Sequence, residues 1–146
     1  MIINKMNDSH VCQIAELEKL CFNDPWSEKS IASELDNRLS CWLVALDGDT
    51  VIGYVGSQTV LGETDMMNIA VHPDYRNKGI ATDLIEGLIE TLTKQGSHSL
   101  MLEVRATNEP AKNLYNKLGF EVVGIRKNYY RNPKEDALIL RKEWSL

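Results

Sequence analysis

The segment 80–92 constrains the fold more than any other part of the sequence. Its apolar side chains recur three and four positions apart, which is typical of one buried face of an α-helix. They are Ile80, Ala81, Leu84, Ile85, Leu88, Ile89 and Leu92. Gly96 follows as a stop signal. Strand-like runs at 65–71 and 99–104 flank this helix, so the sequence predicts a strand–helix–strand crossover at the centre of the fold.

The remaining segments complete an α+β order of β-α-α-β-β-β-α-β-α-β-β. The length suits one domain, expected over residues 1–146, and no repeat or linker interrupts it. A first helix is expected from Asp8 or Ser9 to Cys21, and a second is expected after Ser27. A further helix is expected from Asn108 to Leu118. The other strands are expected at 1–5, 41–46, 50–60, 120–126 and 136–143, with a connecting loop at 127–135.

Composition excludes several classes of protein. The chain is 43% hydrophobic and 25% charged, as is usual for a globular protein and unlike a disordered one. Its longest apolar run falls far short of the ~20 residues of a membrane span, and its start does not resemble a signal peptide. The three cysteines lack a C-x-x-C spacing and are expected to be reduced, in a cytoplasmic protein.

The charge is distributed unevenly along the chain. Residues 1–65 hold 4 lysines and arginines against 11 aspartates and glutamates, whereas residues 66–146 hold 12 against 10. The net charge of −5 argues against a general nucleic-acid binder. An acidic half beside a mildly basic half suits a site where a cationic substrate meets an anionic cofactor, although solvated surfaces give the same bias.

The turn before the central helix has the features of an anion site. The first N–H groups of a helix lack intrahelical partners, and its dipole favours negative charge there. Gly79 lets a phosphate approach the backbone, and Arg76 and Lys78 add positive charge. Ordinary turn chemistry explains a single glycine equally well. The sequence contains neither G-x-x-x-x-G-K-[ST] nor G-x-G-x-x-G, which excludes two other phosphate loops.

The same turn carries a more specific pattern, R-x-x-G-x-A from Arg76 to Ala81, after the strand 69–71. It resembles the signature motif of the GNAT superfamily of N-acetyltransferases, which holds the pyrophosphate of acetyl-coenzyme A (acetyl-CoA). The resemblance implies a GNAT fold, with a mixed central sheet of about six to seven strands flanked by about four helices. It also implies acetyl-CoA as co-substrate, with no metal. The implied cofactor-binding residues are Ile69, Ala70, Val71, Arg76, Asn77, Lys78, Gly79, Ile80, Ala81, Thr82 and Asn108.

Three further segments resemble the RimI family of ribosomal-protein N-alpha-acetyltransferases. They are Asn23-Asp24-Pro25-Trp26-Ser27, the run from Leu102 to Tyr115, and Arg126-Lys127-Asn128-Tyr129-Tyr130 with Glu135-Asp136-Ala137. The resemblance assigns Glu103 as general base and Tyr115 as general acid, and it places Trp26, Tyr129 and Tyr130 at the acceptor site. It implies transfer to the N-terminal alanine of the eighteenth small-subunit ribosomal protein, a basic partner. Acidic residues of the first half, such as Glu28, Glu34 and Asp36, would favour a cationic peptide.

Simpler roles remain open for these residues. Glu103 would also suit an ion pair with Arg105, Tyr115 a place in the core, and Asn108 a helix N-cap. The cysteines lack a neighbouring histidine or basic flank, which disfavours an acyl-enzyme, and the three histidines are scattered without metal-ligand spacing.

Two other functions remain as alternatives. One is acetylation of a lysine side chain or a small-molecule amine, and the other is a catalytically idle CoA-binding sensor. We expect a monomer that binds neither nucleic acid nor membrane.

Overall fold

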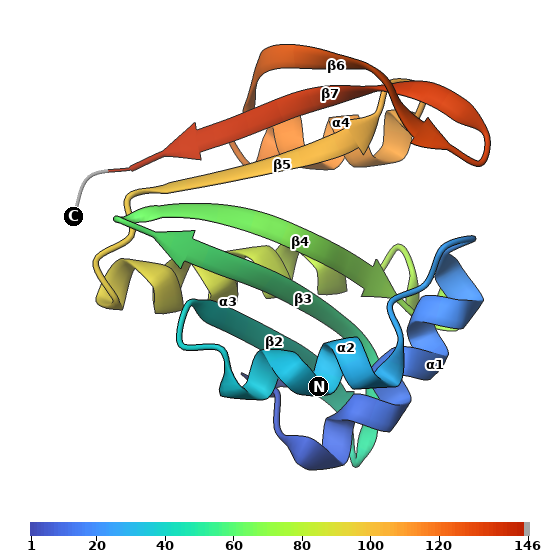
Figure 1. Ribbon diagram of the computed structural model, residues 1–146. Coiled ribbons are helices and arrows are strands. Elements are labelled where there is room, and N and C mark those ends of the chain that lie inside the picture. The colour runs from blue at the N-terminus through green and yellow to red at the C-terminus, as the bar shows by residue number, and fades with distance from the viewer. Residues whose placement is uncertain (145–146) are drawn as a thin grey trace.

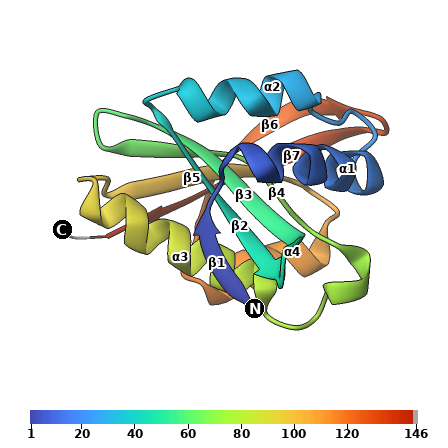
Figure 2. The same ribbon diagram turned by 90° about the horizontal axis from the view of Figure 1, so that it is seen from below.

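The computed structural model describes residues 1–144 as a seven-stranded sheet with helices on both faces (Figures 1 and 2). The strands lie in the order β1-β2-β3-β4-β5-β7-β6. They are β1 (Ile2–Lys5), β2 (Ser40–Asp47), β3 (Thr50–Val60), β4 (Glu63–Val71), β5 (Ser99–Arg105), β6 (Glu121–Arg131) and β7 (Lys134–Glu143). The helices are α1 (Val11–Cys21), α2 (Glu28–Ser33), α3 (Ile80–Lys94) and α4 (Glu109–Lys117), with 3-10 turns η1 (Asp8–His10), η2 (Glu34–Asp36) and η3 (Pro73–Tyr75).

Two hydrophobic clusters hold the helices to opposite faces of the sheet. The first joins α3 and α4 to the strands, and the apolar stripe of α3 lies in it, with Leu84, Ile85, Leu88 and Leu92 fully buried. The second lies beneath α1 and α2 and contains Ile14, Ile31, Trp42 and Tyr54. Figure 2 shows α1 and α2 on one side of the strands and α3 on the other. Because each cluster removes apolar area from water, the two together fix both helical layers on the sheet.

The aromatic part of the second cluster depends on a glycine. The Trp42 ring stacks on Tyr54 with ring centroids 5.8 Å apart, and Trp26 meets it edge-on at 5.4 Å. A Cβ at Gly56 would lie 2.4 Å from the indole, so only glycine lets this ring lie flat across β3. The stack brings the loop before α2 onto the sheet.

The central crossover leaves a gap in the sheet. Strands β4 and β5 are parallel but pair only at Glu63–Ser99, Thr64–Leu100 and Asp65–Met101, and they diverge beyond these pairs (Figure 1). The register of β4 on β3 slips after Met66, so Met67 is an extra residue in a bulge. A bulge bends its strand and increases the local twist. From Met66 to Val71, β4 therefore has a strand partner on the β3 side alone.

The structure confirms the predicted order of elements, the mixed sheet and the helix caps at Ser27 and Asn108. Two boundaries differ. The expected N-cap at Asp8 or Ser9 falls inside the 3-10 turn η1, which Asn7 caps, and α1 follows it without a side-chain cap. The strand β4 begins at Glu63, because the chain turns at Leu61 and Gly62, both of which have positive φ. Residues 145–146 of the predicted domain lie outside the described residues.

The expected loop at 127–135 is wrong, because most of it belongs to β6 and β7, which meet in a short turn at Asn132–Pro133. The segment lacks the apolar alternation of a half-buried strand because β6 is the sheet edge and is exposed along almost all its length. Its register on β7 breaks between Arg126 and Tyr130, where Asn128 has a φ of 55°. Within residues 1–144, no helix is both long and apolar enough to cross a lipid bilayer.

Candidate active site

The N-terminus of α3 presents free backbone donors at the surface. Gly79 is the N-cap with a φ of 80°, and no side chain caps the helix, which leaves the first N–H groups, at Ile80, Ala81 and Thr82, available. No heavy atom lies within 4 Å of a Cβ built at Gly79, so an anion can approach its backbone. The helix dipole favours negative charge at this end. The predicted phosphate loop therefore has the form that a pyrophosphate requires.

The three basic or amide side chains of this loop remain exposed. Arg76 Nε donates to the Val71 carbonyl at 3.2 Å and its Nη2 lies 3.6 Å from Cys21 Sγ. The Lys78 ammonium lies over the Tyr75 ring, 5.3 Å from its centroid. Asn77 adopts a φ of 62°, which turns the chain toward Gly79. Arg76 thus ties the loop to the end of β4, the strand that borders the gap.

The gap-facing edge of β4 supplies backbone groups next to that loop. His72 N–H donates to Ile52 on β3, and hydrogen-bond direction alternates along an antiparallel strand. Ala70 therefore pairs with β3, whereas the N–H groups of Ile69 and Val71 face the gap. Ile69 N–H donates to Asn68 Oδ1 at 3.1 Å. Of the three β4 residues predicted to contact the coenzyme, two thus present backbone N–H groups to the gap.

Glu103 borders the gap from the opposite strand. It lies on β5 facing away from Leu102 and Val104, which are buried in the α3–α4 cluster, and its side chain is 23% exposed. Its carboxylate lies 3.4 Å from Arg126 Nε on β6. The alternative pairing with Arg105 is wrong, because Arg105 lies 3.4 Å from Glu135 on β7 instead.

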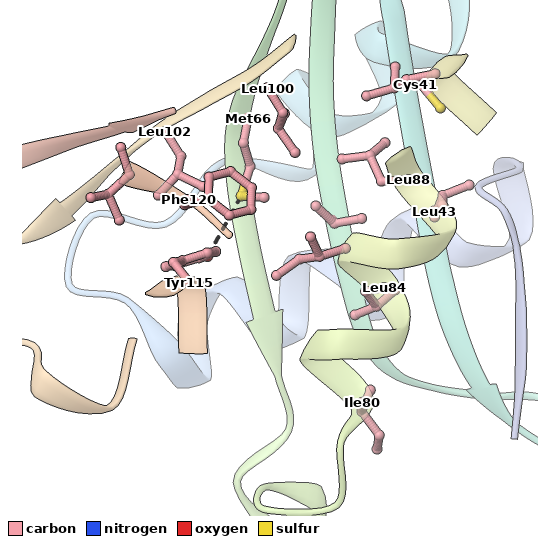
Figure 3. Packing of buried hydrophobic residues seen from close by; sticks show 14 of the residues in the cluster. Cys41, Leu43, Met66, Ile80, Leu84, Leu88, Leu100, Leu102, Tyr115 and Phe120 are labelled. Atoms are coloured by element: carbon pink, nitrogen blue, oxygen red, sulfur yellow. Dashed lines mark hydrogen bonds between the residues drawn. The ribbon is translucent and has the colours of Figure 1, made fainter. Parts of the chain in front are cut away.

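Tyr115 approaches the gap from the other face of the sheet. Its hydroxyl lies 3.9 Å from the sulfur of Met66, the first β4 residue beyond the β4–β5 pairs (Figure 3). Its ring meets Phe120 edge-on at 5.3 Å and is 4% exposed. Burial, and then the neighbouring Tyr130 phenol, raise the pKa of Tyr115 above its ordinary value. The phenol is therefore protonated at neutral pH and is able to donate a proton.

Tyr129 and Tyr130 lie together on β6, with their ring centroids 5.1 Å apart. Arg105 lies over the Tyr130 ring at 4.3 Å. Burial raises the pKa of Tyr130 to about 12, and the charge of Glu103 adds to this effect. Tyr129 is 47% exposed, next to Arg126 at 5.6 Å. Tyr130 thus lies close enough to Glu103 to be affected by its charge, and Tyr129 lies beside Arg126, the ion-pair partner of Glu103.

The loop before α2 meets the tip of the β6–β7 hairpin. Asn23 Nδ2 donates to the Asn132 carbonyl at 2.9 Å, and Asn132 Nδ2 donates to Asp24 Oδ2 at 3.3 Å. Trp26, predicted to line the acceptor site, lies in the same loop but turns its ring onto Trp42. Two acceptor-side segments, more than 100 residues apart in sequence, are therefore joined.

Asn108 has the simpler role that the sequence left open. Its Oδ1 accepts from the Ala111 N–H at 3.2 Å and caps α4, and the residue stays exposed. Capping fixes the start of α4, the helix that carries Tyr115 further along. A coenzyme contact from the same side chain is compatible with this geometry. Among residues 1–144, no group of three or more His, Cys, Asp or Glu side chains is arranged to hold a metal ion.

The sequence analysis gave no individual role to three polar residues of this region. Arg126 pairs with Glu103, and Glu135 accepts hydrogen bonds from the Thr107 N–H and hydroxyl. These hydrogen bonds, and then Arg105, lower the pKa of Glu135. The third is Glu18, buried in α1 against Asn68. Glu18 carried a signal, because a charged residue four positions after Ile14 falls within the apolar stripe of its helix.

The fold, the uncapped helix end and the open edge of β4 define an acetyl-CoA-dependent acyltransferase. The profile of the Acetyltransferase (GNAT) family matches residues 11–120, so this chain belongs to that family. Acetyl-CoA is the acetyl donor of the family.

Individual relatives carry a more specific name. The ribosomal protein bS18-alanine N-acetyltransferase of Escherichia coli strain K12 is 42% identical over 118 residues, which cover 80% of this chain and 79% of that protein. The Salmonella typhimurium protein of the same name is 38% identical over 127 residues, covering 86% and 85%. The crystal structure of the ribosomal-protein-S18-alanine N-acetyltransferase from Escherichia coli superposes with a TM-score of 0.91 at 35% identity, covering 99% of this chain and 94% of that one.

Proposed function

We propose that this chain transfers the acetyl group of acetyl-CoA to the N-terminal alanine of ribosomal protein bS18, acting in the cytoplasm as a monomer. The observation that carries the proposal is the arrangement of two proton-transfer groups at the β4–β5 gap. Glu103 reaches it from one face of the sheet and Tyr115 from the other. An acyl donor lying in the gap would meet an incoming amine on the Glu103 side and a proton donor on the Tyr115 side.

The coenzyme would be held mainly by backbone groups. The N–H groups at the start of α3, with Arg76 and Lys78, suit the pyrophosphate, and the free edge of β4 suits an extended chain of amides such as pantetheine. The gap-facing N–H groups of Ile69 and Val71 would donate to the thioester oxygen as it gains negative charge. Such preorganised donors stabilise an oxyanion without reorganising during the reaction.

The chemical step requires a neutral amine and a proton for the departing sulfur. The amine nitrogen attacks the thioester carbonyl carbon, a nitrogen–carbon bond forms, and the carbon–sulfur bond breaks. Glu103 would take the proton of the amine, directly or through one water molecule, and Tyr115 would give its proton to the thiolate. An α-amino group has a pKa of ~7.7–8.0 against ~10.4 for lysine, so an N-terminus is more easily made neutral.

The acceptor is proposed from the relatives and from the hairpin side of the gap. The Escherichia coli and Salmonella typhimurium proteins, 42% and 38% identical to this chain, are named for the alanine of bS18. Among the acidic residues expected to attract a basic peptide, Glu34 is excluded. It is 7% exposed and accepts hydrogen bonds from Asn37 and Gln58. Glu28 and Asp36 are exposed and remain in that role.

The test measures thiol release from acetyl-CoA with two peptides that begin Ala-Arg and contain an internal lysine. One has a free N-terminus and the other has it blocked. We expect activity with the free peptide alone. Activity with both would assign the reaction to lysine. If neither peptide supports thiol release while acetyl-CoA still binds, the result would favour a small-molecule acceptor or a CoA-binding sensor.

A further inference from the structure

Glu18 is a buried carboxylate that the proposed chemistry does not use. It lies on α1 and is 1% exposed, yet both of its oxygens accept hydrogen bonds. Trp26 N–H donates to Oε1 at 2.7 Å, and Asn68 Nδ2 donates to Oε2 at 2.6 Å. Burial raises the pKa of Glu18, and the two hydrogen bonds oppose that effect. Burying a carboxylate is costly, so these two partners are what make the position tolerable.

The Asn68 amide can face in only one direction. Its Nδ2 donates to Glu18, so its Oδ1 must face the other way, where it accepts from the Ile69 N–H at 3.1 Å. Asn68 directly follows the extra residue Met67, where the register of β4 slips. A hydrogen-bonded chain thus runs from α1 through the bulge to a backbone N–H that faces the gap.

The other oxygen of Glu18 fixes the acceptor-side loop. Trp26 N–H belongs to the segment whose Asn23 and Asp24 bond to Asn132 at the tip of the β6–β7 hairpin. One carboxylate therefore connects the strand that borders the acyl donor with the loop that borders the acceptor. These contacts span 50 residues from Glu18 to Asn68 and 8 from Glu18 to Trp26.

We propose that Glu18 is a positioning residue for acetyl transfer, orienting Asn68 and the Ile69 N–H at the β4 bulge while holding the Trp26 loop beside the gap. The inference rests on the proposed function. In the free enzyme, Asn68 Oδ1 satisfies the Ile69 N–H. A developing oxyanion is a stronger acceptor than an amide oxygen, so it replaces Asn68 there, and Glu18 retains the amide through its Nδ2.

Exchanging the donor and acceptor groups between positions 18 and 68 tests this arrangement. The single side-chain oxygen of the Glu18→Gln variant accepts from either the Trp26 N–H or Asn68 Nδ2, and not from both. If it stays with Trp26, its NH₂ group faces the Asn68 NH₂ group and the Asn68 amide flips away from the Ile69 N–H. If it stays with Asn68, the Trp26 loop loses its hydrogen bond. Asn68→Asp places two buried carboxylates together. The double variant restores one donor and one acceptor, with the second carboxylate oxygen facing the Ile69 N–H. Glu16→Gln, on the exposed side of α1, is the matched control.

The measurements are kcat and KM with the free Ala-Arg peptide, the Kd of acetyl-CoA, and Tm. We expect each single variant to lose about 10- to 100-fold in kcat, since small displacements of reacting groups are costly. The double variant should recover Tm but only part of kcat, because its carboxylate at position 68 competes with the oxyanion for the Ile69 N–H more strongly than an amide does. The control should match the wild type. The Kd should stay within about threefold in all of them, because the α3 terminus binds the pyrophosphate independently.

Other outcomes would overturn the inference. The inference fails if Glu18→Gln retains the wild-type kcat. It also fails if the single variants lose kcat only in proportion to their loss of Tm and the double variant recovers neither kcat nor Tm. Where Glu18→Gln does not fold, Asn68→Ala replaces it, because this variant keeps the bond between Glu18 and Trp26. Loss of kcat with normal Tm then supports the role, and wild-type kcat rejects it. If the wild-type enzyme does not acetylate the free Ala-Arg peptide, the proposed function itself is overturned, before any variant is compared.

Discussion

The two flanks of the β4–β5 gap are built differently. One flank, β2 to β4 with α3, is the side proposed to bind the acetyl donor, and we call it the donor flank. Its strands β2 and β3 are buried along most of their length, and α3 packs across them. The other flank, β5 to β7, is the side proposed to bind the acetyl acceptor, and we call it the acceptor flank. Its strand β6 is exposed almost throughout, and its register on β7 slips twice. Val122, Val123 and Ile125 are exposed to solvent. The donor flank offers backbone N–H groups at the gap, whereas the acceptor flank offers side chains.

This difference accords with the proposed placement of the coenzyme on one flank and the acceptor on the other. A coenzyme common to a whole family is well matched by backbone groups, which any sequence with the same fold retains. An acceptor that differs between enzymes is better matched by exposed side chains, which change without disturbing the core. The comparison implies that substitutions on the two flanks alter different kinetic constants.

The largest effect is expected from Glu103→Gln on the acceptor flank. An amide does not accept the amine proton, so kcat should fall by about 10²- to 10⁴-fold, the usual range for a general base. The Kd of acetyl-CoA should stay unchanged because its proposed contacts lie across the gap. Steady-state kinetics and calorimetry measure the two quantities, with Glu121→Gln, exposed at the start of β6, as control. Unchanged kcat would remove Glu103 from the mechanism.

A smaller effect is expected from Gly79→Ala on the donor flank, compared with Gly96→Ala at the other end of α3. Both glycines have positive φ, 80° and 88°, and neither has an atom within 4 Å of a built Cβ. Each variant should lose about 1 kcal/mol of unfolding free energy from backbone strain.

Only Gly79→Ala should weaken the binding of acetyl-CoA, raising its Kd by roughly tenfold, because the added Cβ occupies the approach to the N-terminus of α3. Denaturant unfolding and calorimetry separate strain from binding. Equal affinities for acetyl-CoA in the two variants would place the coenzyme elsewhere.

The smallest effect is expected in the pH dependence of stability on the acceptor flank. The pKa of Glu135 is lowered from 4.5, chiefly by hydrogen bonds from Thr107. Its ionised form therefore stabilises the fold at pH values above 4.5, and that contribution is lost as pH falls through the lowered pKa.

Thermal unfolding from pH 7 downward should thus show a Tm advantage of wild type over Glu135→Gln that disappears in acid. In a Thr107→Ala background, the advantage at pH 7 should be smaller. A difference in Tm that does not vary with pH would assign the effect to packing instead of charge.

Local patterns in the sequence predicted much of this architecture. The α3 stripe, the caps at Ser27 and Asn108 and the hairpin at Asp47–Thr50 depend on residues within a few positions of one another. Periodicity and capping are physical properties of such short segments. The motif 76–81 likewise predicted free N–H groups at the start of α3, where the structure has no side-chain cap.

The edge strand β6 shows where such patterns fail. Residues 127–131 resemble a loop because they are polar and follow no alternation, yet β6 continues through them because Tyr130 and Arg131 pair with β7 beyond the register break. An edge strand with both faces in water buries too little to leave a signal in its own sequence.

The tertiary structure alone decided how the predicted residues meet. The sequence by itself determined the elements, the family resemblance and the candidates Glu103 and Tyr115. It did not determine that β4 and β5 separate after Asp65, that Glu103 pairs with Arg126, or that Glu18 reaches Asn68. These relations join residues 23 to 50 positions apart, on different strands or on a helix and a strand. Such contacts depend on the relative placement of whole helices and strands, which is set by the burial of both hydrophobic clusters together.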